Sequence, residues 1–335
     1  MGLLPTAAAD VTICIPAWQA EPFIDRTLAC ARAQTHAAVR IVVSVDASSD
    51  RTLQACLRHA DEDARVEVIA QRERLGWSRN ANFLLARVVT EWFFLYFHDD
   101  IIAPTYTEKL LRALRDRPDA MSIHCDLERF GNQTAVDPGN DYVGSPAHRL
   151  LGFLVGPIKG TPLRSLTRTA LLDGGLRFAE IGTDGFWRCH PFVLTLLAAG
   201  PALRYPEVLY RRWFRDGSLT TFWSPATASE LIEGQRQSAL RCRAIIDGLR
   251  GSDDDKQLVR YALRIFILTW TREVELPLGN ADLIDPLAIS PAFADAAPPR
   301  ALDSATPEVQ EWLRRGQARL EALEATHAQR HGRVT

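Results

Sequence analysis

The sequence lacks the features that mark membrane, secreted and metal-cluster proteins. Its six cysteines are scattered, with no Cys-x-x-Cys pair and no histidine at ligand spacing, which argues against a disulfide framework and a structural zinc site. No apolar stretch approaches the roughly 18 residues needed to span a bilayer, and the N-terminus has no basic start or long apolar core. We therefore expect a soluble, cytoplasmic protein with at most peripheral membrane contact.

Strong net charge and glycine-rich phosphate loops are also missing. The formal charge of the 335 residues is −2, so no global field favours nucleic acid as a partner. Lysine occurs only as Lys109, Lys159 and Lys256, and arginine supplies the other positive charges. No turn carries Gly-x-Gly-x-x-Gly or Gly-x-x-x-x-Gly-Lys, which disfavours a Rossmann dehydrogenase and a P-loop enzyme.

What the sequence does have is a regular alternation of two patterns over its first 125 residues. Short β-branched runs predict strands, and segments with apolar residues at helical spacing predict the helices between them. The strands are expected at 11–16, 39–45, 66–70 and 121–125, and the helices at 21–32, 51–59, 79–89 and 107–115. This order predicts an α/β fold with a mostly parallel, doubly wound sheet that binds ligands at its strand carboxyl ends.

The central strand is the apolar run that begins at Trp92 and stops at two adjacent carboxylates, Asp99 and Asp100. Neighbouring acids repel each other unless a cation or a proton lies between them. The pair therefore suggests a hard divalent metal with oxygen ligands, and the alternative is a solvated Asp-Asp turn.

Seven segments in the same order resemble the motifs of the inverting glycosyltransferases of family two, which have the GT-A fold. Each segment is weak alone, but their order and spacing together are specific. They are Ile15-Pro-Ala-Trp-Gln-Ala-Glu21, Val43-Ser-Val-Asp-Ala-Ser-Ser-Asp50, Gly76-Trp-Ser-Arg-Asn80, Phe97-His-Asp-Asp100, Gly174-Gly-Leu-Arg-Phe178, Gly182-Thr-Asp184, and Pro206 to Tyr210 with Gly217-Ser-Leu219.

The resemblance implies transfer of a sugar from a nucleotide diphosphate donor, most often UDP-linked, to an acceptor hydroxyl with inversion. Asp99 and Asp100 would bind Mn²⁺ or Mg²⁺, and Asp184 would take the acceptor proton, with His190 and Glu180 in reserve. The acceptor class stays open among glycan, lipid-linked, peptide and small molecules. The donor would contact Pro16, Ala17, Trp18, Glu21, Asp46, Arg79, Asn80, His98 and Arg215.

Each of three assigned residues also has a plain structural alternative. Asp46 could be a turn residue after a strand, Arg79 a surface residue of a helix, and Asp184 a helix cap. The sequence is compatible with the functional and the structural role of each of these residues.

The chain also departs from the family pattern. Phe97 replaces the first carboxylate of the metal motif, Val45 replaces the first of two paired acids, and Thr183 stands where glutamate is common. Arg215 occupies the place of a histidine that often binds the metal. We therefore expect metal stimulation without strict metal dependence. A non-catalytic glycosyltransferase-like module that binds nucleotide-sugar or glycan is the alternative function.

The resemblance ends near residue 220, and the character of the chain changes there. Residues 130–146 read as a mobile polar loop within the first part. Beyond Phe222 only helices are expected, at 229–249, 254–273 and 307–328. This predicts a GT-A domain over 1–222 and a helical extension over 223–335. The extension would shape the acceptor site or a homodimer interface through Phe222, Trp223, Phe266 and Trp270, with a packed core over 261–270 as the alternative.

Overall fold

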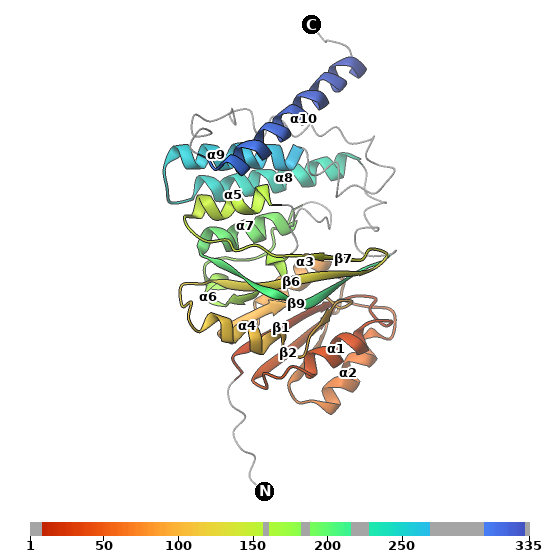
Figure 1. Cartoon of the computed structure of the whole chain (residues 1–335). Coiled ribbons are helices and arrows are strands. Elements are labelled where there is room, and N and C mark those ends of the chain that lie inside the picture. The colour runs from red at the N-terminus through yellow and green to blue at the C-terminus, as the bar shows by residue number, and fades with distance from the viewer. Residues whose placement is uncertain (1–8, 157–160, 182–187, 216–227, 269–304, 332–335) are drawn as a thin grey trace. The chain divides into compact units, whose positions relative to one another are not determined.

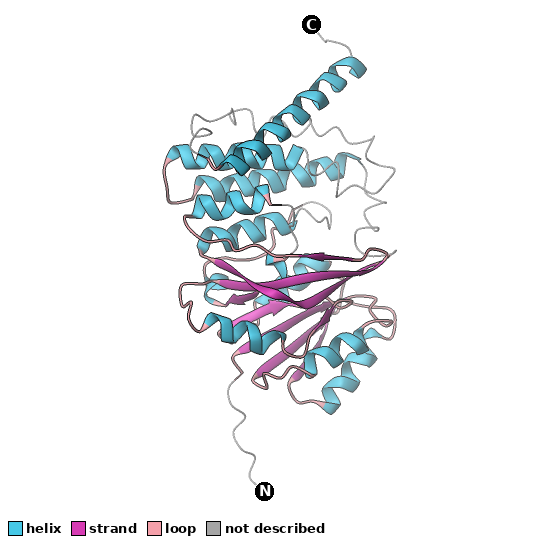
Figure 2. Cartoon of the chain, in the orientation of Figure 1, coloured by secondary structure: helices cyan, strands magenta, loops and turns pink. Residues whose placement is uncertain are grey.

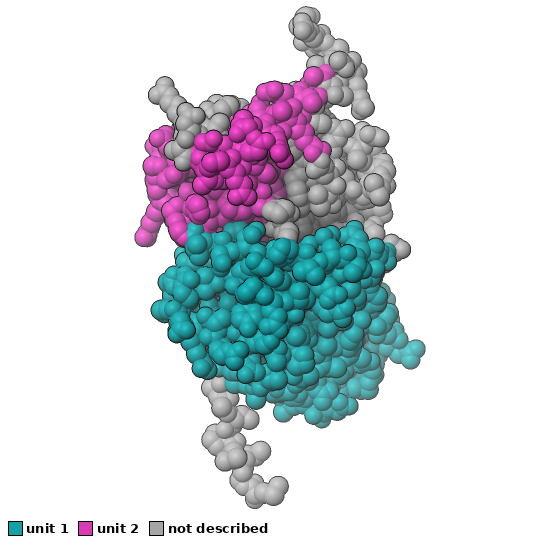
Figure 3. Space-filling view, viewed as in Figure 1, with its two compact units in different colours: residues 1–143, 158–180, 199–216 teal, residues 144–157, 181–198, 217–335 magenta. Residues whose placement is uncertain are grey.

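The computed structural model describes residues 9–156, 161–181, 188–215, 228–268 and 305–331. The chain forms two compact units, coloured separately in Figure 3. Unit 1 consists of residues 1–143, 158–180 and 199–216, and unit 2 of residues 144–157, 181–198 and 217–335. In the described parts of the chain, strands occur only in unit 1 and unit 2 is helical (Figure 2). The predicted domain boundary after residue 222 stays a prediction, because it falls between described segments.

The first half of unit 1 is a parallel sheet, as the alternation of patterns predicts (Figure 1). Its strands lie in the order β3-β2-β1-β4, so the chain starts near the middle and their carboxyl ends share one edge. All seven residues of β1 and all four of β4 are buried, as expected for strands covered on both faces. The elements are β1 Val11–Ala17, α1 Ile24–Arg32, β2 Val39–Val45, α2 Thr52–Glu62, β3 Val66–Ala70, α3 Trp77–Leu85 and β4 Trp92–Leu95.

The second half of the sheet mixes directions. β8 runs antiparallel to both of its neighbours, β4 and β6, whereas β9 runs parallel to β6 and antiparallel to β5. The α/β fold class is thus confirmed: β1 to β4 pair with one another only in parallel, and the second half combines the parallel β6–β9 pair with antiparallel pairs. The elements are β5 Ile101–Ile102, α4 Tyr106–Leu114, β6 Ser122–Gly131, β7 Ala135–Asp137, η1 Pro162–Arg164, β8 Leu166–Arg168, α6 Ala170–Asp173 and β9 Ala202–Phe214.

The polar stretch at 130–146 differs from the loop that its composition predicts. β6 continues to Gly131, and β7 turns back to pair with it as a hairpin. The physical reason is long-range, because β9 supplies backbone partners along β6 as far as the Gly131–Phe214 pair. Local polarity does not prevent a strand where a neighbouring strand satisfies its backbone groups.

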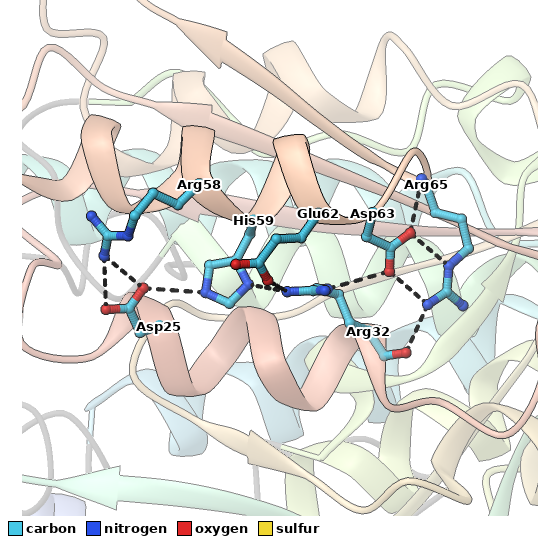
Figure 4. A network of polar contacts seen from close by, with 7 residues as sticks. All are labelled: Asp25, Arg32, Arg58, His59, Glu62, Asp63 and Arg65. Atoms are coloured by element: carbon cyan, nitrogen blue, oxygen red, sulfur yellow. Dashed lines mark hydrogen bonds and ion pairs between the residues drawn. The ribbon is translucent and has the colours of Figure 1, made fainter.

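Two helices over the parallel half are joined by a network of charged side chains (Figure 4). At its centre His59 of α2 contacts Asp25 at 3.1 Å through Nε2 and receives a hydrogen bond of 2.9 Å from Arg32 at Nδ1. Because arginine can only donate, His59 is held as the neutral Nε2–H tautomer. The network fixes α1 against α2, and it thereby also holds the loops that precede both helices. Its other members are Arg58, Glu62, Asp63 and Arg65.

Unit 2 packs helices around α9. Its described elements are α5 Pro146–Val155, α7 Cys189–Ala199, α8 Ala228–Asp247, α9 Asp253–Ile265 and α10 Pro307–His331, and α9 contacts α5, α8 and α10. Gly316 of α10 lies so close to Ile265 that a β-carbon would clash with it. Buried Arg149 donates to the carbonyls of Leu197 (2.6 Å) and Ala198 (3.0 Å) at the end of α7.

The apolar stripe that begins in α9 and continues past its end belongs to the core of unit 2 over its described length. Tyr261, Phe266 and Leu268 are buried, and the Phe266 ring lies 6.5 Å from that of Phe153. The packed-core alternative therefore holds for Phe266, whereas Phe222, Trp223 and Trp270 lie outside the described residues. Across the described chain, no helix has both the length and the apolar character needed to span a bilayer.

Candidate active site

The loops after β1 and β2 are locked together at the carboxyl edge of the sheet. Gln19 and Ala47 both adopt left-handed backbone conformations, with φ of 46° and 48°. Such conformations cost a non-glycine residue roughly 1–2 kcal/mol and persist where the surroundings enforce them. Here Gln19 donates from its backbone to Ser48 (3.0 Å), and its side-chain oxygen accepts from the backbones of Ser49 and Asp50. The two loops therefore form one rigid platform next to Pro16, Ala17 and Trp18.

Glu21 is part of this locking. Its carboxylate accepts a hydrogen bond from the Arg51 backbone (3.1 Å) and pairs with the Arg51 guanidinium (3.0 Å). Its own backbone N–H donates to Asp50 at 3.0 Å. The structure thus places Glu21 beside the start of α2, and its contact with the donor stays a prediction.

Asp46 directly follows β2 and holds the loop after β3 in place. It is 1% exposed, and its two oxygens accept from the backbone N–H groups of Leu75 (2.6 Å) and Gly76 (2.9 Å). Gly76, at φ 81°, turns the chain into α3. Asn80, also buried, bonds to the Ser44 hydroxyl (2.5 Å) and carbonyl (3.0 Å). Asp46 therefore fixes the loop at 71–76, and Asn80 ties α3, which follows that loop, to β2.

That loop brings Arg74 to the platform and is itself contacted by Arg79 of α3. The Arg74 guanidinium lies 3.6 Å from the centre of the half-buried Trp18 ring, which is a cation–π contact. Arg79 donates from Nε to the carbonyl of Leu75 at 2.7 Å. Of the predicted donor contacts, Trp18 and Arg79 are therefore brought to the same loop.

The turn after β4 carries His98, Asp99 and Asp100. His98 Nδ1 donates to the carbonyl of Pro16 at 3.1 Å, so this turn is tied to the end of β1. The backbone carbonyl of His98 also accepts a hydrogen bond from the Thr27 hydroxyl of α1 at 2.7 Å. The platform and the turn therefore share one edge of the sheet.

Asp100 is a buried anchor. It is 2% exposed, and its carboxylate accepts from the Tyr210 hydroxyl (2.8 Å), the Trp213 backbone N–H (3.0 Å) and Arg164 Nε (3.3 Å). Burial raises the pKa of the Asp100 carboxyl, and the Arg164 charge opposes that rise. The residue thereby joins η1, β9 and the end of β4.

Asp99 has a different environment. Its side chain is 17% exposed and pairs with Arg215 at 3.2 Å, and its backbone carbonyl accepts from Arg26 at 2.8 Å. Phe97, two residues earlier, faces the Arg164 guanidinium at 4.8 Å. Adjacent carboxylates in the sequence therefore have separate arginine partners.

The residues at this turn do not fit a metal held by several protein ligands. In the part of the chain that the structure describes, no group of three His, Cys, Asp or Glu side chains is arranged for a metal ion. Both oxygens of Asp100 already accept hydrogen bonds, and Asp99 faces a guanidinium. Metal binding by Asp99 and Asp100 stays a prediction.

The proposed base, Asp184, lies outside the described residues. Of the two reserve residues, Glu180 is exposed in unit 1, whereas His190 is buried in α7 of unit 2 with its ring 5.0 Å from that of Phe266.

Sequence reasoning missed Gln19, Arg26, Arg74 and Trp213. The run from Tyr210 to Arg215 is rich in aromatic residues and arginine, which was the available signal. Its pairing with residues about 100 positions earlier comes only from the sheet.

Comparison with known proteins finds a family match for part of the chain. Residues 12–159 match the model of glycosyl transferase family 2. EpsH of Bacillus subtilis is 26% identical over 167 residues, 49% of this chain and 48% of EpsH. An uncharacterized glycosyltransferase of Haemophilus influenzae is 28% identical over 119 residues, 35% of this chain and 37% of that protein. The matches thus span about half or less of these relatives' length.

Solved structures agree on the fold. TarS 1–349 of S. aureus, solved in complex with UDP-GlcNAc, superposes with a TM-score of 0.70 at 16% identity, covering 96% of this chain and 92% of that one. The mannosyltransferase PcManGT of Pyrobaculum calidifontis, in complex with GDP-Man and Mn²⁺, gives 0.54 at 19% identity, covering 94% and 87%. At such identities the likeness shows the fold. Residues 12–159 therefore match glycosyl transferase family 2, and the chain has the GT-A fold that the ordered motifs predict.

Proposed function

We propose that this chain is a glycosyltransferase that moves a sugar from a UDP-sugar to an acceptor hydroxyl with inversion. One observation carries the proposal: the locked β1–β2 platform and the turn that contains Asp99 meet at one edge of the sheet. Both lie within residues 12–159, which match the family model. Ligands of open α/β sheets bind at this edge. The choice of UDP follows TarS, a structural neighbour solved with UDP-GlcNAc.

The residues of the platform suit a nucleotide. The Trp18 ring with Arg74 stacked on it offers a flat surface for a base, and the loop held by Asp46 borders it. Rigid loops reduce the ordering that binding would otherwise require. We assign Asp46 and Asn80 to positioning this loop, and Pro16, Ala17, Trp18 and Arg79 to donor contacts.

Chemistry requires two further roles. The acceptor hydroxyl attacks the anomeric carbon from the face opposite the nucleotide, and a carboxylate, Asp184 in this proposal, takes its proton. Negative charge builds up on the leaving diphosphate, so positive groups near Asp99 stabilise the transition state. Glycan, lipid-linked, peptide and small-molecule acceptors are all compatible with these roles.

The test is a screen of nucleotide sugars with the purified full chain. We expect slow hydrolysis of one UDP- or dTDP-sugar without acceptor, read as release of the nucleoside diphosphate. Asp184→Asn should abolish release, whereas Asp173→Asn, an exposed control carboxylate in α6, should not. Tight donor binding without any turnover, unchanged by Asp184→Asn, would identify the alternative, a non-catalytic binding module. Absence of binding to every nucleotide sugar would refute the transferase and leave glycan binding as the only form of the alternative.

A further inference from the structure

Two arginines from distant parts of the chain converge on Asp99. Arg26, in α1, donates to the Asp99 backbone carbonyl at 2.8 Å. Arg215, just after β9, donates to the Asp99 carboxylate at 3.2 Å. Both contacts lie within unit 1, at the turn where a metal-dependent relative would need several carboxylates. Positive charge is therefore already concentrated where the donor diphosphate would lie.

Aromatic rings hold both guanidiniums in place. Arg215 lies 4.3 Å from the Phe23 ring centre and Arg26 lies 4.8 Å from that of Trp213, while the two rings meet edge to face at 5.1 Å. A guanidinium packed on a ring face keeps its five N–H groups in its own plane, directed away from the ring. This packing leaves an arginine geometrically suited to bidentate contact with phosphate oxygens.

The rest of the turn is built to support this pair. The Trp213 backbone is fixed by buried Asp100, and Gly131 passes so near the indole that a β-carbon there would lie 2.5 Å from ring atoms. The Arg215 side chain is 20% exposed, so a solvent-borne ligand can reach it. Phe97, which replaces a carboxylate of the family motif, packs against Arg164 and adds no negative charge.

We propose that Arg26 and Arg215 bind the diphosphate of the nucleotide donor directly and take over the charge neutralisation that a divalent metal would otherwise supply. The inference rests on the proposed function. As the sugar–phosphate C–O bond breaks, its electron pair moves to the β-phosphate oxygen, and the acceptor oxygen forms the new bond and gives its proton to the carboxylate base. The two arginines bind the oxygens on which this charge accumulates. Asp99 orients both guanidiniums through one carboxylate and one carbonyl contact.

The decisive measurement is calorimetric binding of UDP, UMP and uridine to the full chain, in excess EDTA and with added Mn²⁺ or Mg²⁺. We expect the Kd for UDP in EDTA to stay within about threefold of its value with metal. Arg215→Gln and Arg26→Gln should each weaken UDP by roughly 10- to 100-fold, as for loss of a charge-assisted hydrogen bond, and leave uridine unchanged. Arg211→Gln is the matched control, because Arg211 lies in β9 four residues before Arg215, is 44% exposed and pairs with Glu128.

Two results would overturn the inference. One is UDP binding by the parent protein that is lost in EDTA and restored by Mn²⁺. This result needs no variant, and it would show that a metal neutralises the diphosphate charge. The other is unaltered UDP affinity in both arginine variants, with folding verified by circular dichroism. Either result leaves the proposed transferase function intact. If the parent binds no nucleoside diphosphate with or without metal, the proposed function fails as well.

Discussion

Replacing Asp100 by alanine should destabilise unit 1 far more than replacing its neighbour Asp99. The side chain of Asp100 is 2% exposed and bonds to Tyr210, Trp213 and Arg164. The substitution removes the Asp100 carboxylate from beside the buried Arg164 charge, itself 8% exposed. Breaking a buried ion pair in this way costs about 3–5 kcal/mol. For a unit of this size that corresponds to a fall in Tm of roughly 6–20 °C.

Two comparison variants separate the contributions. Tyr210→Phe removes one hydroxyl from Asp100 and should cost about 1–3 kcal/mol. Asp99→Ala removes a partly exposed ion pair, 17% and 20% exposed, and should cost no more than about 1 kcal/mol. Far-UV circular dichroism during urea unfolding at pH 7 measures all three. Equal stability of Asp100→Ala and the parent, or a larger loss in Asp99→Ala, would refute the assignment of Asp100 as the structural anchor of this turn.

Three further predictions follow from local geometry. Burial against Gly139 lowers the pKa of His124 to about 4, so on acidification the unfolded chain binds a proton at a higher pH than the folded chain does. The free energy of unfolding should therefore fall by roughly 3 kcal/mol as pH drops from about 6.5 towards 4. In urea titrations, His124→Gln should lose this pH dependence. Ala47→Gly should raise stability by up to about 1 kcal/mol, since glycine adopts φ 48° without strain; a lower urea midpoint would contradict this. Gly131→Ala should cost roughly 1–3 kcal/mol, because φ is +97° and its β-carbon meets Trp213; a parent-like midpoint would contradict it.

Element order could be predicted from the sequence because each β-α unit of the parallel half carries its own signal. The buried runs that become β1 and β2 are β-branched, and the helices between strands show their period locally. Boundaries are less accurate where a cap is ambiguous. Ser78 looks like a helix cap, but α3 begins at Trp77 and Ser78 is buried inside it, because Gly76 makes the turn.

The candidate site, too, could be predicted only in part from the sequence. The ordered motifs predict which strand ends carry polar residues, and Trp18, Asp46, Arg79 and His98 do lie along the platform and the turn. The local sequence does not show which of the predicted site residues contact a ligand and which hold the backbone in place. Asp46 and Asn80 look like ligand contacts in the sequence, yet both are buried and bonded to backbone groups of neighbouring segments.

The sequence by itself determined the resemblance to a glycosyltransferase family, the α/β order and the edge of the sheet at which chemistry is expected, because motif spacing and hydrophobic periodicity are local properties of the chain. Only the tertiary structure decided what the adjacent carboxylates do. Asp100 is buried by partners at Arg164, Tyr210 and Trp213, while Asp99 meets Arg26 and Arg215. Arg26 lies 73 positions before Asp99, and the other partners lie 64 to 116 positions after the carboxylate that they contact. The pairing of β9 with β5 and β6 brings Tyr210 and Trp213, and Arg215 just after them, to the turn. Side-chain roles that depend on such long-range pairing leave no periodic trace in the sequence.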